Sequence, residues 1–584
     1  MSRDGQATLE APPRKDNYKW VALSNTTVGI MLATIDSSIL LIAMPDIFRG
    51  IKLNPLSPSN TFYLLWMILG YLIVSSVLVV SLGRLGDIKG RVRMYNLGFV
   101  IYTSSSLLLA TDWMTGTHGA DWLIGWRVVQ GVGGAFLMAN TAAILTDAFP
   151  RNQRGLALGI SNVAGIAGTF IGLILGGVLA PINWRLVFLV SVPLGLFGTI
   201  WAYKVLQERG ERHASRIDWL GNITFAAGLI LVMVGITNGI LPSGGHAMGW
   251  TNPTTIVELA VGVAGLVAFA FIERVVPNPM FRLALFKIRA FTAGTLASFL
   301  AACARGGLMF MLIIWLQGIW LPQHGYSFEN TPLWAGIYML PLTLGILLAG
   351  PLSGILSDRF GARGFSTGGM IGTGAMFVFL SLLPVNFHYA PFALLLFMEG
   401  CCIGAFASPN RAAVMNSLPP ADRGAGGGMN ATFQNSAQVL SIGVFFSLMI
   451  AGLSRTLPAT LAAGLESHGV AVAQAQHLAH LPPVSVLFAA FLGYNPIKTL
   501  LGPKVLASVS PANRAALIGR SFFPRLIADA FRSGLHEAFA FAVVCCLIAA
   551  AASLLRGKHP VDDEAGMRPA GADLADAPAE FIAH

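Results

Sequence analysis

GRLGDIKGR, residues 83–91, and GILSDRFGA, residues 354–362, are two versions of one motif, and their placement decides the fold of this chain. Both stretches follow a long apolar run and precede another. Two further similarities occur at nearly the same spacing, between Gln130-Gly131 and Glu399-Gly400 and between residues 150–155 and 419–424. Three matches in corresponding places predict two copies of one helical unit in the same orientation.

The apolar runs around these motifs predict a membrane protein built from helices. Of the 584 residues, 55% are hydrophobic and 11% are charged, whereas a soluble domain carries roughly 25% charged residues. A span needs about 20 mostly apolar residues. Fourteen runs meet this need: 21–45, 61–83, 94–111, 121–147, 155–180, 184–205, 218–241, 253–273, 291–321, 332–357, 365–384, 390–415, 425–452 and 534–555.

Basic residues lie in alternate connections between these runs. The intervening connections 112–120, 242–252, 322–331 and 385–389 contain no Lys or Arg. The positive-inside rule therefore predicts a multi-pass protein of the plasma membrane with both termini in the cytoplasm. The same rule accounts for the formal net charge of +10, so we expect no nucleic-acid partner.

The repeat divides the chain into segments of six, two and six spans. We expect a cytoplasmic segment at 1–19, a six-helix half at 20–205, a two-helix insert at 206–290 and a second six-helix half at 291–555. The second half contains a long outer connection, 453–533, whose Leu, Phe and Val content predicts short helices. The acidic, Ala- and Pro-rich stretch 556–584 is expected to be a disordered cytoplasmic tail.

Several motifs resemble those of the major facilitator superfamily, in particular the fourteen-span drug:proton antiporters of the EmrB/QacA type. Residues 83–93 are similar to the signature loop between spans two and three, and Ile35–Pro45 resembles the acidic motif of span one. Residues 127–134 (RVVQGVGG) resemble the span-four motif. Residues 168–177 resemble the antiporter motif of span five, with Leu173 where the family usually has proline. Residues 305–310 are similar to an actinobacterial EfpA-like branch.

This resemblance implies a secondary transporter that exports apolar or cationic small molecules in exchange for protons, by alternating access. Its partners would be these solutes, protons and membrane lipids, and we expect a monomer without enzymatic activity. The sequence contains no Gly-x-x-x-x-Gly-Lys-Ser/Thr run, so direct use of ATP is not expected. We also expect no cofactor and no metal. Two alternatives stay open, namely export of a lipid-like solute and a non-transporting scaffold or sensor.

Four charged residues fall inside predicted spans, where charges are costly and usually functional. Asp36 in span one is the expected proton carrier or contact for a cationic solute. Arg127 in span four would couple protonation to movement. The second half reverses the signs, with Arg305 in its first span and Glu399 at the position of Gln130. We hypothesise that Glu399 pairs with Arg305, either structurally or as a second proton site. For each residue, a purely structural role is the alternative.

The repeated loop motif supplies the expected gating residues. They are Gly83, Asp87, Gly90, Arg91 and Arg154 in the first half and Asp358 and Arg423 in the second. Asp87 is expected to pair with arginines across the halves when the cytoplasmic side closes. Its expected partners are Arg91 and Arg154, Asp358 with Arg423 would be the equivalent pair of the repeat, and a solvated loop acid is the alternative. Four glycines at helical spacing, Gly168, Gly172, Gly176 and Gly177, are expected to form one flat packing face.

Overall fold

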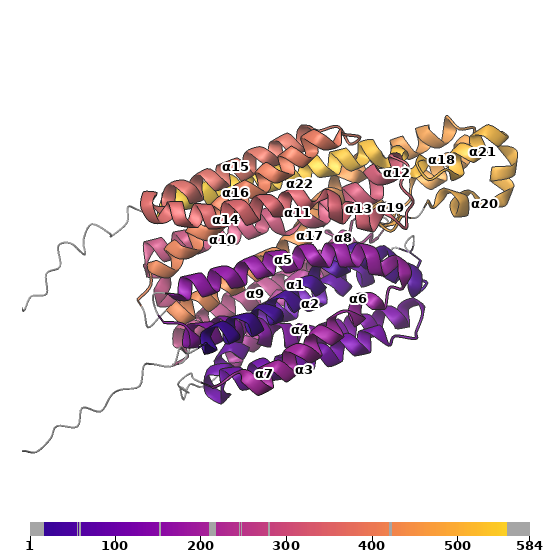
Figure 1. Cartoon of the computed structure of the whole chain (residues 1–584). Coiled ribbons are helices and arrows are strands. Elements are labelled where there is room, and N and C mark those ends of the chain that lie inside the picture. Colours follow the sequence, from indigo (N-terminus) through magenta and orange to yellow (C-terminus); the bar gives the residue numbers. More distant parts are fainter. Residues whose placement is uncertain are drawn as a thin grey trace, which may run out of the picture.

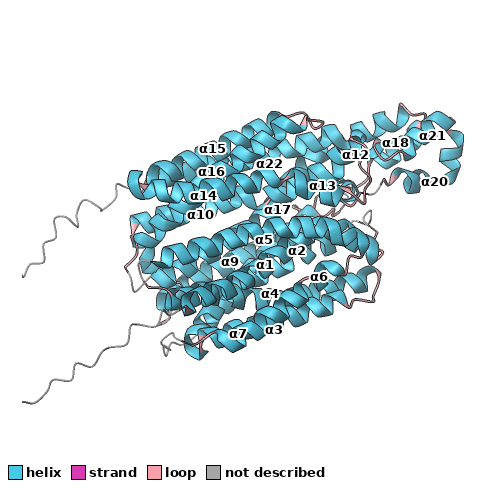
Figure 2. Ribbon diagram, viewed as in Figure 1, coloured by secondary structure: helices cyan, strands magenta, loops and turns pink. Residues whose placement is uncertain are grey.

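The computed structural model is helical throughout the part of the chain that it describes (Figure 2). It describes residues 17–556, apart from gaps at 55–56, 58–59, 151–152, 209–217, 245, 247, 278, 280, 420–422 and 494. The segment 1–16 and nearly all of the predicted tail, 557–584, lie outside the described residues. In a membrane every backbone polar group needs an internal partner, which long helices supply.

The first bundle contains the helices that precede the insert. They are α1 (Tyr18–Gly50), α2 (Asn60–Lys89), α3 (Arg91–Ala110), α4 (Gly116–Ala148), α5 (Arg154–Ile182), α6 (Leu186–Leu189) and α7 (Ser191–Val205). Figure 1 shows this N-terminal bundle in indigo and magenta on one side of the molecule.

The second bundle follows the insert and begins with a broken helix. It contains α10 (Arg289–Gly306), α11 (Leu308–Ile313), η3 (Ile314–Trp320), α12 (Leu321–Gln323), α13 (Thr331–Tyr338), α14 (Leu340–Phe360), α15 (Ala362–Leu382), α16 (Tyr389–Asn416), α17 (Arg423–Glu466) and α22 (Phe522–Leu554). Of these, η3 is a seven-residue π-helix, a form of helix that is frequent at functional sites. This C-terminal bundle lies opposite the N-terminal bundle in Figure 1.

Thirteen helical segments in the described chain are long and apolar enough to cross a membrane. The fourteenth predicted span corresponds to α3, a helix of 20 residues whose two arginines and three serines lower its hydropathy. α3 packs between α4 and α7, both of which meet the criterion. The layout of six, two and six spans remains a prediction.

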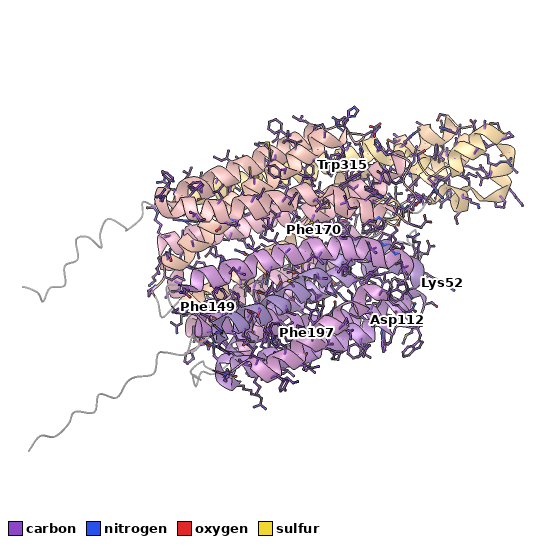
Figure 3. All side chains as sticks on the ribbon, viewed as in Figure 1. Lys52, Asp112, Phe149, Phe170, Phe197 and Trp315 are labelled. Carbon is purple, nitrogen blue, oxygen red and sulfur yellow. The ribbon has the colours of Figure 1, made fainter. Side chains whose placement is uncertain are left out.

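Successive connections alternate between the two ends of the molecule. Figure 3 shows Lys52, after α1, and Asp112, after α3, at one end, and Phe149, after α4, at the other. The helices α18, α20 and α21 project from the end that carries Lys52 (Figure 1). The start of α1 lies at the opposite end, because the ring centroids of Trp20 and Phe149 are 5.7 Å apart. Figure 1 shows the end of α22 on this side as well, so the described chain begins and ends on the same side.

One contact between the two bundles involves α13, toward the end that carries α18. There α5 packs on α13, so that a Cβ added at Gly336 of α13 would lie 3.2 Å from the Leu173 carbonyl oxygen of α5. In addition, Gln317 Nε2 of η3 lies 3.5 Å from the Ile42 carbonyl oxygen of α1. A second line of contact runs between α2 and α17.

The insert consists of α8 (Trp219–Ile240) and α9 (Pro253–Val275), followed by the 3₁₀ helix η2 (Leu283–Lys287). α8 contacts both α2 and α17, so it packs along the seam between the bundles. The side chains of Ser81 in α2 and Asn222 in α8 are hydrogen-bonded. On the other side, the ring of Phe281, between α9 and η2, contacts the ring of Phe433 in α17 in a tilted arrangement, with the two centroids 5.4 Å apart. The insert lies between the two bundles in the sequence, and in the structure it contacts both of them.

The predicted outer connection is largely helical, as expected, but it is shorter than predicted. α17 continues to Glu466 and α22 already begins at Phe522, so both helices extend far past the predicted ends of their spans. Between them lie α18 (Val472–Ala479), α19 (Pro483–Phe491), α20 (Ile497–Ser508) and α21 (Pro511–Ile518). Every residue of α19 is buried, since this apolar helix packs against η3, α17, α2 and α22.

Candidate functional site

Asp36 lies fully buried in α1, where it faces α4. Arg127 Nη1 donates to one carboxylate oxygen of Asp36, forming a buried ion pair. Gln130 Nε2 donates to the other oxygen at 3.1 Å and also to Ser106 Oγ of α3 at 2.9 Å. Gln130 Oε1 in turn accepts from Arg127 Nη1 at 2.6 Å. The Asp36 carboxylate of α1 is thus bound to two side chains of α4, and Gln130 extends this network to α3.

Local features of α2 and α4 position the arginine. Arg127 and Gln130 are three residues apart and therefore share one face of α4. The ring of Tyr71 in α2 lies 4.6 Å from the Arg127 guanidinium carbon, which provides a cation–π contact. Gly131 makes this approach possible, because a Cβ there would lie 2.9 Å from the Tyr71 carbonyl oxygen. The glycine-rich motif of α4 thus lets an aromatic ring cover a buried charge.

Three of the four predicted packing glycines hold α1 in place. A Cβ added at Gly168, Gly172 or Gly176 would meet backbone atoms of α1 at 3.2 Å or less. Gly177 faces in another direction, since its Cβ would lie 2.6 Å from the backbone nitrogen of Leu333 in α13. The prediction of one common face is therefore wrong for Gly177, which follows Gly176 directly and so is turned about 100° around the helix. It packs between the bundles instead.

The network is balanced in charge but not fully satisfied. Arg127 Nε is buried without a hydrogen-bond partner among the described residues. Removing one member of a buried ion pair leaves an uncompensated charge, which costs several kcal/mol. Adding a proton to Asp36 has the same consequence for Arg127.

Glu399 and Arg305 do not form the ion pair that we hypothesised. Glu399 is fully buried in α16, and neither of its carboxylate oxygens has a hydrogen-bond partner in the described part of the chain. Arg305 lies near the end of α10 with an exposed side chain. The two charges still influence each other electrostatically. The hypothesis was wrong because the spacing of residues in the sequence predicted which helices carry the two charges, but it did not predict the direction in which each side chain points.

The first loop motif forms its ion pairs within one bundle. Arg91 bonds Asp87 through Nε at 2.8 Å, and its Nη1 bonds Asp147, near the end of α4, at 2.6 Å. Arg91, one of the two expected partners of Asp87, therefore pairs with it, whereas pairing of Asp87 across the two halves stays a prediction. Asp147 was missed in the sequence because it lies just outside the repeated segment 150–155.

Gly90 separates α2 from α3 with a φ of 109°, a conformation that glycine adopts readily. Glu208, which follows α7, accepts a hydrogen bond from the Arg91 backbone nitrogen at 2.7 Å. A carboxylate at this position favours the start of α3, because the helix N-terminus carries a partial positive charge. A Cβ at Gly90 would lie 2.6 Å from a Glu208 carboxylate oxygen. Glu208 is a second residue that sequence reasoning missed.

The second copy of the motif repeats this backbone geometry. Gly361 separates α14 from α15 with a φ of 83°. The side chains of three predicted gating residues, Arg154, Asp358 and Arg423, lie outside the described residues, so their pairing stays a prediction. Gly83 lies in α2, where a Cβ would make ordinary contact with Ala139 at 3.6 Å.

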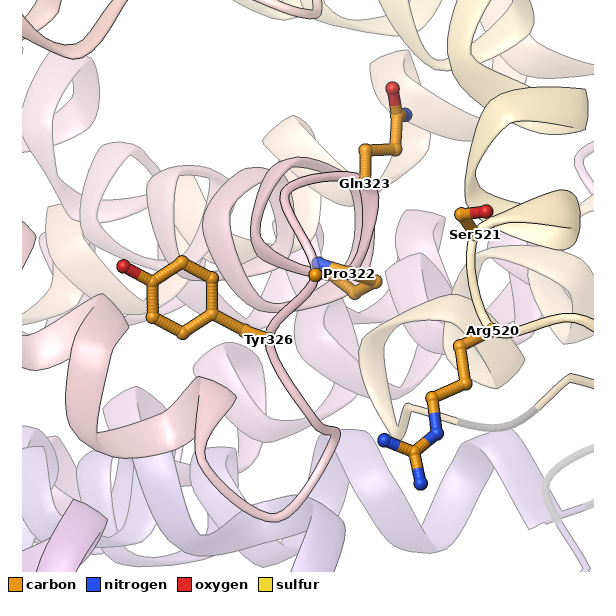
Figure 4. Close-up of a pocket in the computed structure, with 6 residues that line it drawn as sticks. Pro322, Gln323, Tyr326, Arg520 and Ser521 are labelled. Carbon is orange, nitrogen blue, oxygen red and sulfur yellow. The ribbon is translucent and has the colours of Figure 1, made fainter.

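A separate pocket of about 320 Å³ opens at the end of the molecule that carries α18. Figure 4 shows Pro322, Gln323 and Tyr326 on one side of it and Arg520 and Ser521 on the other. It lies between the end of α12 and the start of α22, away from Asp36. No group of three His, Cys, Asp or Glu side chains in the described chain could hold a metal ion.

The chain folds into two helical bundles, and a buried ion pair joins α1 and α4 within the first of them. These features are those of a polytopic membrane transporter, and the sequence identifies the family. The profile of the Major Facilitator Superfamily matches residues 26–442. The chain therefore belongs to this superfamily of transporters.

The relatives include exporters of antibiotics. The tetracenomycin C resistance and export protein of Streptomyces glaucescens is 26% identical over 94% of this chain and 93% of its own length. The riboflavin transporter RibZ of Clostridioides difficile is 28% identical over 75% of this chain and 89% of its length. The uncharacterised transporter EfpA of Mycobacterium tuberculosis is 31% identical over 58% of this chain and 59% of its own.

Solved structures support the fold. A bacterial homologue of the human lysosomal transporter Spinster, in an inward-facing and unoccupied conformation, aligns with a TM-score of 0.54. This alignment covers 94% of the present chain and 100% of the homologue at 14% identity. At that identity the likeness concerns the fold alone.

Proposed function

We propose that this chain is a proton-coupled exporter of apolar or cationic small molecules that works by alternating access. The observation that carries the proposal is the buried network of Asp36, Arg127 and Gln130 between α1, α3 and α4. A buried ion pair is costly to maintain and adds little to stability by itself, which favours a functional reason for it. Similarity to multidrug and antibiotic exporters supports the substrate class.

In the proposed cycle, Asp36 carries the proton. Protonation removes its negative charge and leaves Arg127 without a counter-charge in a buried site, at a cost of several kcal/mol. A rearrangement of α4 relative to α1 relieves this cost. α1 packs tightly on α5, and α5 contacts the C-terminal bundle through Gly177 and Leu173. Motion at Asp36 would thus reach the contact between the bundles.

We assign separate roles to the two charges of the C-terminal bundle. Glu399, which is buried and has no hydrogen-bond partner among the residues that the structure describes, is proposed as a second proton site. Arg305, whose side chain is exposed near the end of α10, is proposed to contact solute or water on the transport path.

The cytoplasmic gate is the third part of the proposal. Asp87, Arg91 and Asp147 form a cluster at the end of the N-terminal bundle where the described chain begins and ends. When the gate closes, this cluster would exchange partners with Arg423 and Asp358 of the second copy. The charge pattern of the connections supports a cytoplasmic location for this end and for both termini. We propose a monomer in the plasma membrane as the working unit.

The test is transport of ethidium by the purified protein in liposomes with an imposed pH gradient. We expect uptake or release that follows the gradient and is lost in Asp36→Asn. Transport that ignores the gradient would remove the antiport proposal. Transfer of fluorescent lipid without ethidium movement would favour the lipid alternative, and absence of both would favour a scaffold.

A further inference from the structure

A groove on the surface of the C-terminal bundle is lined by α14, α15 and α16, and α16 packs against both of the other helices. Its volume is about 610 Å³, within the range of small-molecule sites in proteins. The lining is almost entirely apolar and consists of Ala349, Leu352, Ser353, Leu356, Phe360, Gly361, Gly364, Phe365, Gly368, Gly369, Cys401, Cys402 and Ala405.

Glycines create the width of this groove. A Cβ added at Gly364 or Gly368 of α15 would meet no other atom within 4 Å. The opposite wall keeps large apolar side chains exposed, since Leu352 is 58% and Phe360 75% exposed. These side chains belong to helices that are long and apolar enough to cross a membrane, or to the ends of such helices, and from this we infer that the groove faces lipid. The groove is therefore a depression that hydrocarbon can enter from the side.

The length of the groove is close to the thickness of the hydrocarbon layer in one leaflet of the bilayer. It follows α14 from Gly361 to Ala349, which is a rise of roughly 18 Å along the helix. Half of a hydrocarbon core is about 15 Å thick. A single extended chain that enters at Gly361 would thus end near the bilayer centre, beside Cys401 and Cys402.

Positive charge marks the end at which the groove meets the membrane surface. Arg359 and Arg363 flank Gly361, and both side chains are exposed. The connection 357–364 contains these two arginines and one acid, Asp358, so it keeps a net positive charge. Basic side chains at this depth attract anionic lipid headgroups.

We propose that this groove binds one acyl chain of an anionic glycerophospholipid, whose phosphate lies at Arg359 and Arg363. The assignment to the cytoplasmic leaflet rests on the orientation proposed above, whereas the binding itself does not depend on transport. Different parts of the site bind the acyl chain and the headgroup of this lipid. Packing in the glycine-lined groove holds the chain, since lipid provides no hydrophobic driving force of its own, and the arginines select the charge.

The experiment uses the full chain in nanodiscs that contain phosphatidylglycerol or phosphatidylcholine with a photoreactive diazirine in one acyl chain. After illumination, peptides are mapped by mass spectrometry. We expect adducts on peptides 349–369 and 401–405, with a several-fold preference for phosphatidylglycerol. Each arginine is expected to raise the binding constant for the anionic lipid about fivefold. The double variant Arg359→Gln, Arg363→Gln should lose this preference and still fold, because both side chains are exposed.

A groove-filling variant provides the second arm. Gly368→Leu places a side chain in the open space and should remove the adducts, with unchanged ethidium transport. Gly125→Leu is the matched control, because Gly125 of α4 is exposed and its Cβ would also meet nothing within 4 Å. Equal labelling by the two lipids, or labelling of the groove peptides that survives Gly368→Leu, would overturn the proposal.

Discussion

Replacing Asp36 by asparagine removes the negative charge from the buried network with almost no change in shape. Arg127 is then left as a buried cation without a counter-ion, in contact with Tyr71 and Gln130. We expect lower stability and loss of proton-driven transport. The double variant Asp36→Asn, Arg127→Gln removes both charges and separates these two effects.

The structure sets the expected magnitude. Breaking a buried ion pair by removing one partner costs about 3–5 kcal/mol. Gln130 Oε1 still accepts a hydrogen bond from Arg127 at 2.6 Å, so we expect a loss near the lower limit, about 3 kcal/mol. In the double variant no uncompensated charge remains, and we expect most of this loss to be recovered. Transport should stay absent, because the proton carrier is missing.

The assay is unfolding of the purified proteins in mixed micelles, followed by circular dichroism as the denaturing detergent is increased. Wild type, both single variants and the double variant form a thermodynamic cycle, which isolates the coupling between the two side chains. Gradient-driven ethidium transport is measured on the same preparations. Our reasoning fails if Asp36→Asn costs less than about 1 kcal/mol, or if the double variant regains proton-driven transport.

Three further substitutions probe packing, backbone geometry and the second acid. Gly172→Leu should destabilise the protein by about 1–3 kcal/mol, because its side chain would meet the α1 backbone at Ile35, and a lower unfolding midpoint checks this. Gly90→Ala should cost about 1–3 kcal/mol in the same assay, since alanine is strained at a φ of 109° and its Cβ would also displace Glu208. Glu399→Gln should keep stability within about 1 kcal/mol, because neither oxygen has a hydrogen-bond partner to lose, and should weaken the pH dependence of transport.

Matched controls exist for each of these changes. Gly159→Leu lies on the same helix as Gly172 but in open space, and it should be tolerated. Gly361→Ala has the strained backbone without a neighbour within 4 Å, so it should cost less than Gly90→Ala. An equal cost for the two alanines would argue against the role of Glu208. Unchanged pH dependence in Glu399→Gln would remove the second proton site.

Much of the architecture could be predicted because it depends on local composition. Thirteen of the fourteen apolar runs correspond to described helices that are long and apolar enough to span a membrane. In both copies of the repeated motif, a glycine with positive φ, Gly90 or Gly361, separates two helices. The ends of the last two spans were misjudged, since α17 and α22 continue with more polar sequence beyond the membrane. Hydropathy detects contact with lipid, and it does not detect where a helix stops in water.

The partners of charged side chains were harder to predict. The sequence by itself determined that Asp36, Arg127, Arg305 and Glu399 lie in membrane helices, because long apolar runs surround them. Only the tertiary structure decided that Asp36 pairs with Arg127, while Glu399 has no hydrogen-bond partner within the described chain. Hydropathy and repeats are properties of neighbouring residues. An ion pair depends on the rotation of each helix and on glycines that let particular helices approach, and packing of the whole bundle sets both.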